Sequence, residues 1–456
     1  MELSLSEIAT ITNGQLIGED CQCQALTIDS RAKCLNGLFV ALEGENHDGH
    51  QFIEDAIQHG AIAALVTKEV ESSVPVVKVQ DAVAALAQLG SAWRQRFSIP
   101  IVAITGSNGK TTVKEMVASI FRQFGTVLAT RGNQNNHLGV PLTLLSIERH
   151  HEFAVVEMGA NHIGEIDVLS KMTQPDVALI NNANRAHLEG FGGLRGVAQA
   201  KSEIFNGLKR DGTAIVCRDD AFYEYWKAGI SHEKFLSFGQ HEEADVRLLP
   251  DSIEYIVQEQ HVKTKFSADV VGKRVEFELP LLGTHNILNA LAATSIAYAC
   301  GLDLEKVSAG LSQVAPVKGR LQLKKITDQV TFIDDSYNAN PQSLSAGMNV
   351  LKSLPGKKYL VLGDMAELGQ DEQVLHQDAG FEAKQLGLDG VLTYGSLAAF
   401  AAAAFGSGGE TFEQKNQLTE RLKKIIQRHQ SDEPMYVLVK GSRRSGMEVV
   451  VEAFGG

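Results

Sequence analysis

The stretch from Ile101 to Thr112, Ile-Val-Ala-Ile-Thr-Gly-Ser-Asn-Gly-Lys-Thr-Thr, constrains the fold of this chain more than any other. Its first part is an apolar run rich in β-branched residues, which is typical of a buried strand. Gly106 to Gly109 then predicts a tight loop, and the spacing that follows predicts a helix over Val113–Phe124. A strand, a glycine loop and a helix in this order predict an anion site where the helix begins.

The residues of this loop suit a nucleoside triphosphate. Backbone N–H groups and the positive end of the helix converge on an anion, and Gly106 and Gly109 let the backbone approach it closely. Lys110 would reach the β- and γ-phosphates, and the Thr111 hydroxyl would bind Mg²⁺. The match to G-x-x-x-x-G-K-[ST] is partial, because Ile104 stands where that pattern has glycine. The alternative is an ordinary strand-turn-helix corner with a surface lysine.

Composition narrows the class of protein. At 456 residues the chain is too long for one core and suggests about two to four domains. Its net charge of −13 and the lack of any cluster of Lys and Arg along the sequence argue against nucleic-acid binding. Five cysteines without C-x-x-C spacing favour reduced thiols over a metal site.

No segment of the sequence resembles a signal peptide or a membrane span. The first residues lack a positive start and an apolar core, and the longest apolar run, Leu397–Phe405, is far shorter than a transmembrane helix. We therefore expect a cytoplasmic protein without membrane insertion. We also expect a monomer, although the sequence does not determine the oligomeric state.

Hydrophobic patterning divides the chain into three α/β units, residues 1–82, 83–313 and 314–456. The first unit is small. The second alternates short β-rich runs with helices, which predicts a doubly wound parallel sheet, and antiparallel strands interrupt it between residues 245 and 280. The third restarts the alternation. Strands are predicted at 26–31, 37–42, 61–67, 126–130, 153–158, 177–180, 213–217, 330–333, 358–362, 390–394 and 435–439.

Three side chains outside the phosphate loop are candidates for metal or acid-base chemistry. Glu157 ends a predicted strand and would offer Mg²⁺ a carboxylate at the sheet edge where the loop opens. The alternative is a plain charge at a strand end. His187 also follows a strand, and the alternative for it is a solvated loop residue or a core hydrogen bonder. Lys201 falls on a helix predicted over 196–208, where a lysine ordinarily faces solvent.

Polar residues at two other places predict ligand contacts. Asn286 and Asn289 share one face of a helix that is otherwise alanine and leucine, and unpaired buried amides cost about 1–3 kcal/mol each. A purine edge would satisfy them; helix capping and backbone bonding would do so equally well. The loop at 43–50 would bind a polar ligand together with Ser30 and Arg31, unless it is a plain surface turn. Its candidates are Gly44, His47, Asp48, Gly49 and His50.

Glycine-bearing loops follow three predicted strands of the last unit, at 363–369, 395–396 and 441–444. Ligands of open α/β sheets bind outside the carboxyl ends of the strands. We therefore expect these loops to face a shared cleft.

Taken together, these motifs resemble the ATP-dependent Mur ligase family of peptidoglycan synthesis, in order and over nearly the whole chain. The resemblance rests on Thr105–Thr112, Glu157–Gly159, His187, Lys201, His285–Asn289, Gly319–Arg320 and Asp334–Pro341. Within the family the chain is most similar to the members that join D-alanyl-D-alanine to UDP-N-acetylmuramoyl-tripeptide. That similarity rests on Asn133–Asn136, Gly139–Pro141, Asp334–Pro341, Val361–Gly369 and the Gly44–His50 loop.

The resemblance implies an α/β fold of three domains. These are an amino-terminal domain for the UDP end of the precursor, a central P-loop-type parallel-sheet ATPase domain, and a Rossmann-like carboxyl-terminal domain that closes over the site. It also implies that ATP phosphorylates the tripeptide carboxylate. The amine of D-alanyl-D-alanine would then attack the acyl phosphate and give the amide through a tetrahedral intermediate.

Site residues follow from the resemblance position by position, with Lys110, His187 and Lys201 as the catalytic set. The phosphates of ATP would meet Gly106, Ser107, Asn108, Gly109, Lys110, Thr111 and Thr112. Two Mg²⁺ ions would be held by Thr111, Glu157, His187 and Lys201, with Lys201 carbamylated. Adenine would meet Asn286 and Asn289, and phosphate and ribose would meet Arg320 and Asp335. The UDP end would meet Ser30, Arg31 and the 44–50 loop, and the peptide would meet Asn133, Asn135 and Asn136.

Three alternatives stay open at this point. One is the sister ligase that adds the third residue, whose Asp-Asn-Pro-Arg signature is missing from this sequence. Another is folylpolyglutamate synthetase, but residues 1–80 argue against it because that enzyme lacks an amino-terminal domain of this kind. The last is a nucleotide-binding scaffold, which would leave His187, Lys201 and Asn289 unexplained. Whether the third peptide residue is lysine or diaminopimelate does not follow from the sequence.

Overall fold

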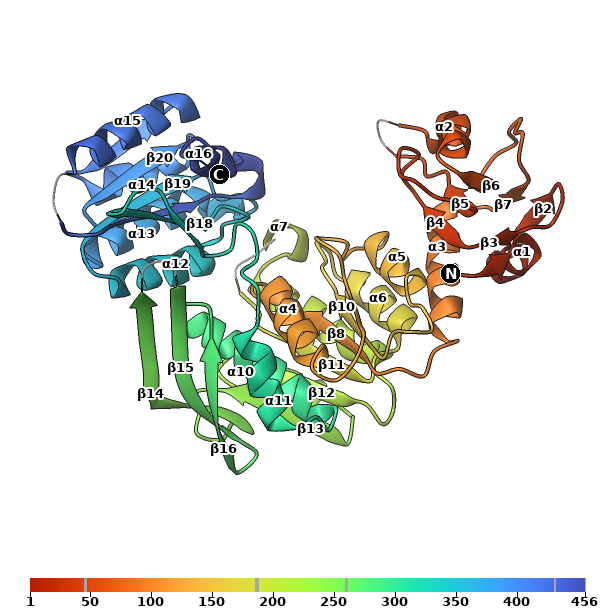
Figure 1. Ribbon diagram of the computed structural model, residues 1–456, viewed down its shortest axis with the longest axis horizontal. Coiled ribbons are helices and arrows are strands. Elements are labelled where there is room, and N and C mark those ends of the chain that lie inside the picture. The colour runs from red at the N-terminus through yellow and green to blue at the C-terminus, as the bar shows by residue number, and fades with distance from the viewer. Residues whose placement is uncertain (45–46, 185–187, 259–260, 430–431, 456) are drawn as a thin grey trace.

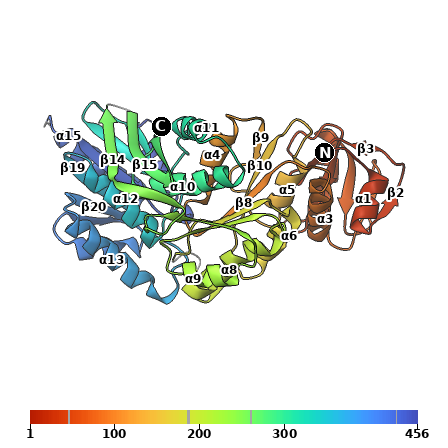
Figure 2. The same cartoon turned by 90° about the horizontal axis from the view of Figure 1, so that it is seen from below.

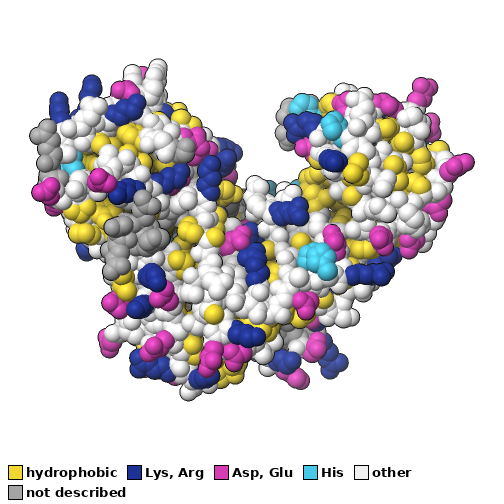
Figure 3. Space-filling model, viewed as in Figure 1, with side chains coloured by type: hydrophobic (Ala, Val, Ile, Leu, Met, Phe, Trp, Pro, Cys, Tyr) yellow, Lys and Arg dark blue, Asp and Glu magenta, His cyan; other side chains and the backbone are white. Residues whose placement is uncertain are grey.

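The computed structural model describes residues 1–44, 47–184, 188–258, 261–429 and 432–455. They form three α/β units in chain order, each built around its own main sheet (Figure 1). The amino- and carboxyl-terminal units stand at opposite ends of the central unit (Figure 2), and the molecule is hollowed between them (Figure 3). Within the described residues, no helix has the length and apolar character needed to cross a membrane.

A five-stranded sheet in the order β2-β7-β6-β5-β4 forms the amino-terminal unit. Its strands are β2 (Gln15–Ile17), β4 (Ala25–Thr27), β5 (Gly37–Val40), β6 (Ala61–Val66) and β7 (Val76–Lys78). Only β2 is antiparallel to its neighbour. A separate ribbon pairs β1 (Leu3–Ser4) with β3 (Gln22–Cys23), and the helices are α1 (Leu5–Thr12) and α2 (Ile53–Gln58). The predicted strands are present with shorter ends, whereas β1, β2, β3 and β7 were not predicted.

Helix α3 (Ala82–Arg94) joins the amino-terminal unit to the central one. Asp81 caps it by accepting the N–H groups of Val83 and Ala84. On its buried face, Leu86 and Leu89 belong to one apolar cluster that holds residues of both units. Trp93 adds a hydrogen bond from its indole N–H to the Ile147 carbonyl, at 2.9 Å. The two units therefore share a continuous core.

Nine strands form the central sheet, in the order β16-β15-β14-β13-β12-β11-β8-β10-β9. They are β8 (Ile101–Thr105), β9 (Val127–Ala129), β10 (Phe153–Glu157), β11 (Val177–Ile180), β12 (Thr213–Cys217), β13 (Lys234–Gly239), β14 (Val246–Gln258), β15 (His261–Val270) and β16 (Lys273–Leu279). Strands β8 to β13 pair with one another in parallel, and β14 pairs in parallel with β13. Strand β15 pairs antiparallel with both β14 and β16, as the sequence predicted. Strand β13 was not predicted.

Helices cover both faces of this sheet, which explains why β8 is buried throughout and apolar from Ile101 to Ile104. Ile101 and Ala103 pack into the cluster on one face, and Val102 and Ile104 pack into the cluster on the other. The helices are α4 (Lys110–Phe121), α5 (Gly139–Leu145), α6 (Glu165–Thr173), α7 (Leu188–Phe191), α8 (Leu194–Ser202), α9 (Tyr223–Gly229), α10 (Thr284–Ala299) and α11 (Leu304–Ser312).

The carboxyl-terminal unit has a six-stranded sheet in the order β17-β18-β22-β19-β20-β21. Its strands are β17 (Gln322–Lys325), β18 (Val330–Asp335), β19 (Lys357–Gly363), β20 (Gly390–Tyr394), β21 (Gly409–Phe412) and β22 (Met435–Lys440). All pair in parallel except β17. Its helices are α12 (Pro341–Ser353), α13 (Glu372–Gln385), α14 (Ala398–Phe405), α15 (Lys415–Arg428) and α16 (Glu448–Glu452). The three-unit α/β architecture is therefore confirmed.

The three glycine-bearing loops of this unit meet at one end of the sheet. The Asp364 carboxylate accepts the N–H groups of Leu397 and Ala398, and the Asp364 carbonyl accepts the N–H of Ser442. The loops are thus tied to one another. The large cavity described below is not lined by them.

Replacing Leu89 by alanine is expected to lower the free energy of unfolding by about 2–5 kcal/mol, because it removes a buried side chain from the shared core. The matched control is Leu35→Ala, since Leu35 is 60% exposed and its truncation should change stability by no more than about 0.5 kcal/mol. Urea unfolding followed by circular dichroism measures both. A loss as small for Leu89→Ala as for Leu35→Ala would contradict the shared core.

Candidate functional site

A cavity of about 820 Å³ opens between the central and carboxyl-terminal units, at the carboxyl ends of β8, β10 and β11. It brings together most of the residues singled out in the sequence. They are Ser107, Asn108, Gly109, Lys110, Thr111, Thr112, Asn133, Asn135, Asn136, Glu157, Lys201, Asn286, Asn289, Arg320 and Asp335. With Lys440 also on its lining, the cavity joins segments up to about 330 residues apart in the chain.

The phosphate loop joins β8 to α4 as the sequence predicted, but the helix begins at Lys110 and ends at Phe121. The predicted span, Val113–Phe124, was wrong by three residues, because the polar Lys-Thr-Thr run forms the first turn. Among the described residues, the N–H groups of Gly109, Lys110, Thr111 and Thr112 have no hydrogen-bond partner. Such a set of unpaired donors at a helix start is an anion cradle.

Glycine is required at position 109 by both conformation and space. Its φ is +79°, in the left-handed region. A Cβ atom there would lie 2.4 Å from Asn289 Oδ1 and 2.5 Å from Asn181 Nδ2. The backbone of the cradle is therefore packed directly against the side chains of Asn289 on α10 and of Asn181, the residue after β11.

Lys110 folds back over the loop that it follows. Its ammonium group donates to the carbonyls of Gly106 at 2.7 Å and Ser107 at 3.3 Å. Burial lowers the pKa of Lys110; Glu157 opposes this shift and Arg320 reinforces it. A bound phosphate would supply the negative charge that this buried ammonium lacks.

Glu157 at the end of β10 has the environment of a metal ligand. It is 2% exposed, and its Oε1 accepts a hydrogen bond from Asn135 Nδ2 at 2.7 Å. Its Oε2 is buried and has no partner among the described residues. A carboxylate oxygen left unpaired in a cavity beside a phosphate cradle fits Mg²⁺, which is typically held by one or two carboxylates, phosphates and waters. The described residues contain no cluster of three or more His, Cys, Asp or Glu that could hold a metal alone.

Lys201 lies on α8 and does not face solvent, so the ordinary expectation for a helical lysine was wrong here. It is 2% exposed, and its Nζ lies 5.3 Å from the centre of the Phe191 ring. Burial, and after it the charge of Lys110, lowers the pKa of Lys201 to about 7. A large fraction of this amine is therefore neutral near pH 7. The helix predicted over 196–208 is α8 followed by a 3₁₀ turn, Glu203–Gly207. His187, the remaining metal candidate, lies outside the described residues.

Cations from both units converge on the cavity, although the sequence shows no basic cluster. Lys110, Lys201, Arg320 and Lys440 all line it. Arg320 donates to the Thr111 hydroxyl at 3.2 Å, and Lys440 donates to the Asp335 carboxylate and so is paired. Burial raises the pKa of Asp335, while Lys440 and Arg320 act in the opposite direction. The lining also holds six carboxylates, those of Glu115, Glu157, Glu165, Asp219, Asp220 and Asp335, so the cavity offers groups for both a polyanion and a cation.

The amides of Asn286 and Asn289 both have protein partners. Asn286 Nδ2 donates to the Leu282 carbonyl at 2.8 Å, and Asn289 Nδ2 donates to Asn286 Oδ1 at 3.2 Å. Neither amide matches the capping alternative, because Gly283 is the N-cap of α10 and Asn289 bonds to a side chain instead of the backbone. Since both residues also line the cavity, contact with adenine stays a prediction.

Sequence reasoning missed a set of asparagines that touch the phosphate loop. Asn181 and Asn182 follow β11 and bond to Asn108, and the Asn184 carbonyl accepts from the Ser107 hydroxyl at 3.0 Å. From the carboxyl-terminal unit, Asn340 Nδ2 donates to Asn108 Oδ1 at 2.6 Å. The available signal was the run Asn-Asn-Ala-Asn directly after a strand. Side-chain amides at that place can reach a neighbouring strand-end loop.

Asn133, Asn135 and Asn136 lie between β9 and α5 on the cavity wall. Asn135 orients Glu157 through the bond described above, and Asn136 Oδ1 accepts the N–H groups of Leu138 and Gly139. Asn133 is exposed to the cavity. Of these three, Asn133 is the one whose side chain makes no hydrogen bond to the part of the chain that the structure describes, although its carbonyl accepts the Asn135 N–H at 2.8 Å.

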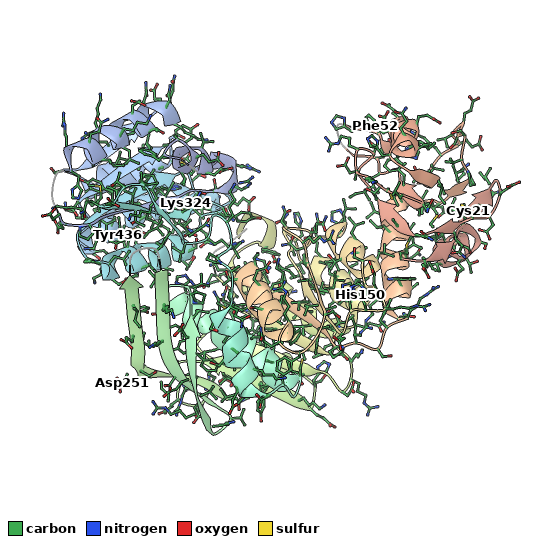
Figure 4. The ribbon with its side chains drawn as sticks, viewed as in Figure 1. Cys21, Phe52, His150, Asp251, Lys324 and Tyr436 are labelled. Carbon is green, nitrogen blue, oxygen red and sulfur yellow. The ribbon has the colours of Figure 1, made fainter. Side chains whose placement is uncertain are left out.

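The amino-terminal candidates lie away from the cavity. Arg31 pairs with Asp29 at 2.9 Å on the surface near Ser30. His50 bonds to Asp48 at 2.6 Å and accepts the Thr67 N–H at 3.0 Å, so the Gly44 and His47–His50 segments are held in a defined turn. Phe52, just beyond it, lies on the side of the unit that faces the carboxyl-terminal unit across the opening (Figure 4). Position 49 requires glycine, because a Cβ atom there would lie 2.6 Å from the Leu42 carbonyl oxygen.

A phosphate cradle, a buried carboxylate with one oxygen unpaired among the described residues, and cations from two α/β units define a nucleotide-using enzyme. Comparison with known proteins identifies the family. Three family models match the chain. The model described as "Mur ligase family, catalytic domain" matches residues 22–94, "Mur ligase middle domain" matches residues 104–297, and "Mur ligase, glutamate ligase domain" matches residues 319–443. The chain belongs to the Mur ligase family and is an ATP-dependent ligase.

Relatives and solved structures of this family match nearly the whole chain. The UDP-N-acetylmuramoyl-tripeptide–D-alanyl-D-alanine ligase of Escherichia coli K12 is 41% identical, over 99% of this chain and 98% of its own. A crystal structure of MurF from Acinetobacter baumannii has a TM-score of 0.92 and 36% identity, covering 100% and 99% of the two chains. MurF of Thermotoga maritima in complex with ADP has a TM-score of 0.81 and 27% identity, covering 94% and 96%.

Gly109→Ala is expected to weaken ADP binding by at least about tenfold, because the added Cβ collides with Asn289 and Asn181 and the left-handed φ is strained. Gly301→Ala is the matched control: its φ is +71° but nothing lies within 4 Å of the added Cβ. It should cost stability through backbone strain and leave ADP affinity unchanged. Isothermal titration calorimetry measures both, and wild-type affinity in Gly109→Ala would contradict the cradle.

Proposed function

We propose that this chain joins D-alanyl-D-alanine to UDP-N-acetylmuramoyl-tripeptide at the expense of ATP, giving UDP-N-acetylmuramoyl-pentapeptide, ADP and phosphate. The identity of the substrates rests on the full-length match at 41% to the E. coli ligase named for them. The chemistry rests on one observation, the cavity in which unpaired N–H groups and the unpaired Glu157 oxygen occur together.

The residues suit phosphoryl transfer from ATP to a carboxylate. In the proposal the N–H groups of residues 109–112 and the Lys110 ammonium hold the phosphates, and Thr111 and Glu157 hold Mg²⁺, which would neutralise charge on the transferred group. The tripeptide carboxylate displaces ADP from the γ-phosphorus and becomes an acyl phosphate. The amine of D-alanyl-D-alanine then adds to that carbonyl, and phosphate leaves as the amide forms. Arg320 supplies further positive charge beside Thr111.

We propose a division of labour among residues 1–82, 83–313 and 314–456. The first binds the UDP end through Ser30, Arg31 and the 44–50 loop, the second binds ATP, and the third completes the site through Arg320 and Asp335. Adenine meets Asn286 and Asn289, and Asn133 with its neighbours meets the peptide. All these residues come from one chain, so the proposal needs no second copy. We also propose a cytoplasmic location, which the need for ATP and a nucleotide-linked precursor supports.

We further propose that Lys201 is carbamylated and holds a second Mg²⁺ together with His187. Carbamate forms when a neutral amine adds to CO₂ and loses a proton, and the pKa of about 7 supplies the neutral amine. The carbamate would also replace the positive charge of a buried lysine beside Lys110 by a negative one. This substitution would relieve the repulsion between the two ammonium groups.

Phosphate release separates the proposed function from its alternatives. With UDP-N-acetylmuramoyl-tripeptide and ATP, release should depend on D-alanyl-D-alanine, and Lys110→Ala should abolish it because the γ-phosphate loses its cation. Lys352→Ala, on the exposed face of α12, is the matched control and should retain full activity. The sister ligase would instead require UDP-dipeptide and a diamino acid. Release that ignores the dipeptide would point to a scaffold and contradict the proposal.

Lys201→Ala should lose activity and regain part of it when a small carboxylate such as formate is added. The wild-type enzyme, depleted of CO₂, should be activated by bicarbonate at pH 8 and much less at pH 6. The sign follows from the lowered pKa: above about 7 the amine is mostly neutral, and below it the amine is protonated and unreactive. Initial rates measure both effects. Full activity of Lys201→Ala without added carboxylate would exclude the carbamate.

A further inference from the structure

Two side-chain amides that the proposed mechanism leaves unused hold the phosphate loop from behind. Asn181 and Asn182 both donate to the backbone carbonyl of Asn108, at 2.9 Å and 3.1 Å. The Asn182 oxygen also accepts the Asn108 N–H at 2.8 Å. The Asn182 amide thus pairs with both backbone groups of one loop residue.

These contacts fix the peptide bond between Asn108 and Gly109. In a trans peptide the C=O and the N–H point in opposite directions. Because the Asn108 carbonyl is bound behind the loop, the Gly109 N–H points to the front of the loop. There it belongs to the set of unpaired donors that begins α4. The opposite orientation would aim a carbonyl oxygen at the phosphates.

Gly109 does not hold this orientation by itself. Rotating a peptide in a tight turn moves the following residue between φ of about +80° and about −90°, and glycine adopts both readily. No other residue fits at 109, because a Cβ atom would collide with Asn289 and Asn181. The close packing at position 109 therefore requires glycine, and glycine leaves the Asn108–Gly109 peptide free to rotate. Other groups have to restrain it.

The restraint is anchored in the core. Asn181 is 4% exposed, and its Nδ2 donates to Asn289 Oδ1 at 2.9 Å as well as to Asn108. Asn289 donates in turn to Asn286, and Asn286 donates to the Leu282 carbonyl. In this series of hydrogen bonds each amide donates to the next group, from Asn181 to the Leu282 carbonyl. Turning one amide would break the bond of the next, so the network resists rotation.

We propose that Asn181 and Asn182 are positioning residues that lock the Asn108–Gly109 peptide with its N–H toward the nucleotide phosphates. They form a peptide clamp, defined by these two residues, on the loop at 106–109. The inference rests on the proposed placement of the ATP phosphates at residues 106–112. It separates recognition of phosphate, which needs the clamp, from recognition of the base, which does not need Asn182.

The clearest test compares ADP with adenosine, because only ADP carries the phosphates. In Asn182→Ala, ADP affinity should fall about tenfold, which corresponds to about 1.4 kcal/mol, while adenosine affinity stays within about twofold of wild type. Asn349→Ala is the matched control, since Asn349 also donates to a backbone carbonyl, that of Ser345, but is exposed on α12 outside the cavity. Competition calorimetry measures both ligands, and thermal melting checks that each variant is folded.

Each outcome decides the inference. Unchanged ADP affinity in Asn182→Ala would overturn it, and so would a parallel loss for ADP and adenosine, which would indicate general support of the cavity. Lys110→Ala serves as a separate probe. If it leaves ADP binding intact, the placement of the phosphates is wrong; if it abolishes ADP binding while Asn182→Ala does not weaken it, only the clamp is wrong.

A crystal structure provides an independent measurement should Asn182→Ala fold poorly. Asn181→Ala crystallised without nucleotide should show the Asn108 carbonyl turned, or in two orientations, because no bound phosphate then selects the wild-type one. A single wild-type orientation in that variant would overturn the clamp.

Discussion

Parallel pairing of β8 with β10 and β11 is the constraint on which the site depends. Ile104 pairs with Glu157, and Ile180 pairs with Thr105. This register ends the three strands at one edge of the sheet, so the phosphate loop, the carboxylate of Glu157 and the amides after β11 emerge side by side. A shift of one residue in β10 would turn Glu157 to the other face of the sheet.

The site carries features that a protein selected for stability alone would avoid. Burial and the charge of Lys110 lower the pKa of Lys201. Among the described residues, one carboxylate oxygen of Glu157 lacks a partner, and the first turn of α4 leaves its donors unpaired. Each of these costs free energy in the free protein. A polyanion and a divalent cation would satisfy all of them together, which is why the unfavourable groups face one cavity. The shared core around α3 and the fully buried β8 supply stability elsewhere.

Sequence reasoning was strongest where side chains act close to their own place in the chain. The strand, loop and helix at 101–121 follow from local pattern, and so does the antiparallel segment after β13. It was weakest where distant segments meet. A helical lysine ordinarily faces water, and nothing near Lys201 in the sequence indicates that α8 turns that side chain inward. Likewise, the asparagines after β11 matter only because the fold places them behind Asn108.

By itself the sequence determined the three α/β units, the phosphate loop and the identity of the groups that could bind ATP, because these depend on local periodicity and on residue chemistry. Only the tertiary structure decided which groups act together. Four cations meet at one cavity of an acidic chain because packing brings together the separate segments that carry Lys110, Lys201, Arg320 and Lys440. Long-range packing sets their distances and their burial, and electrostatic interactions depend on both.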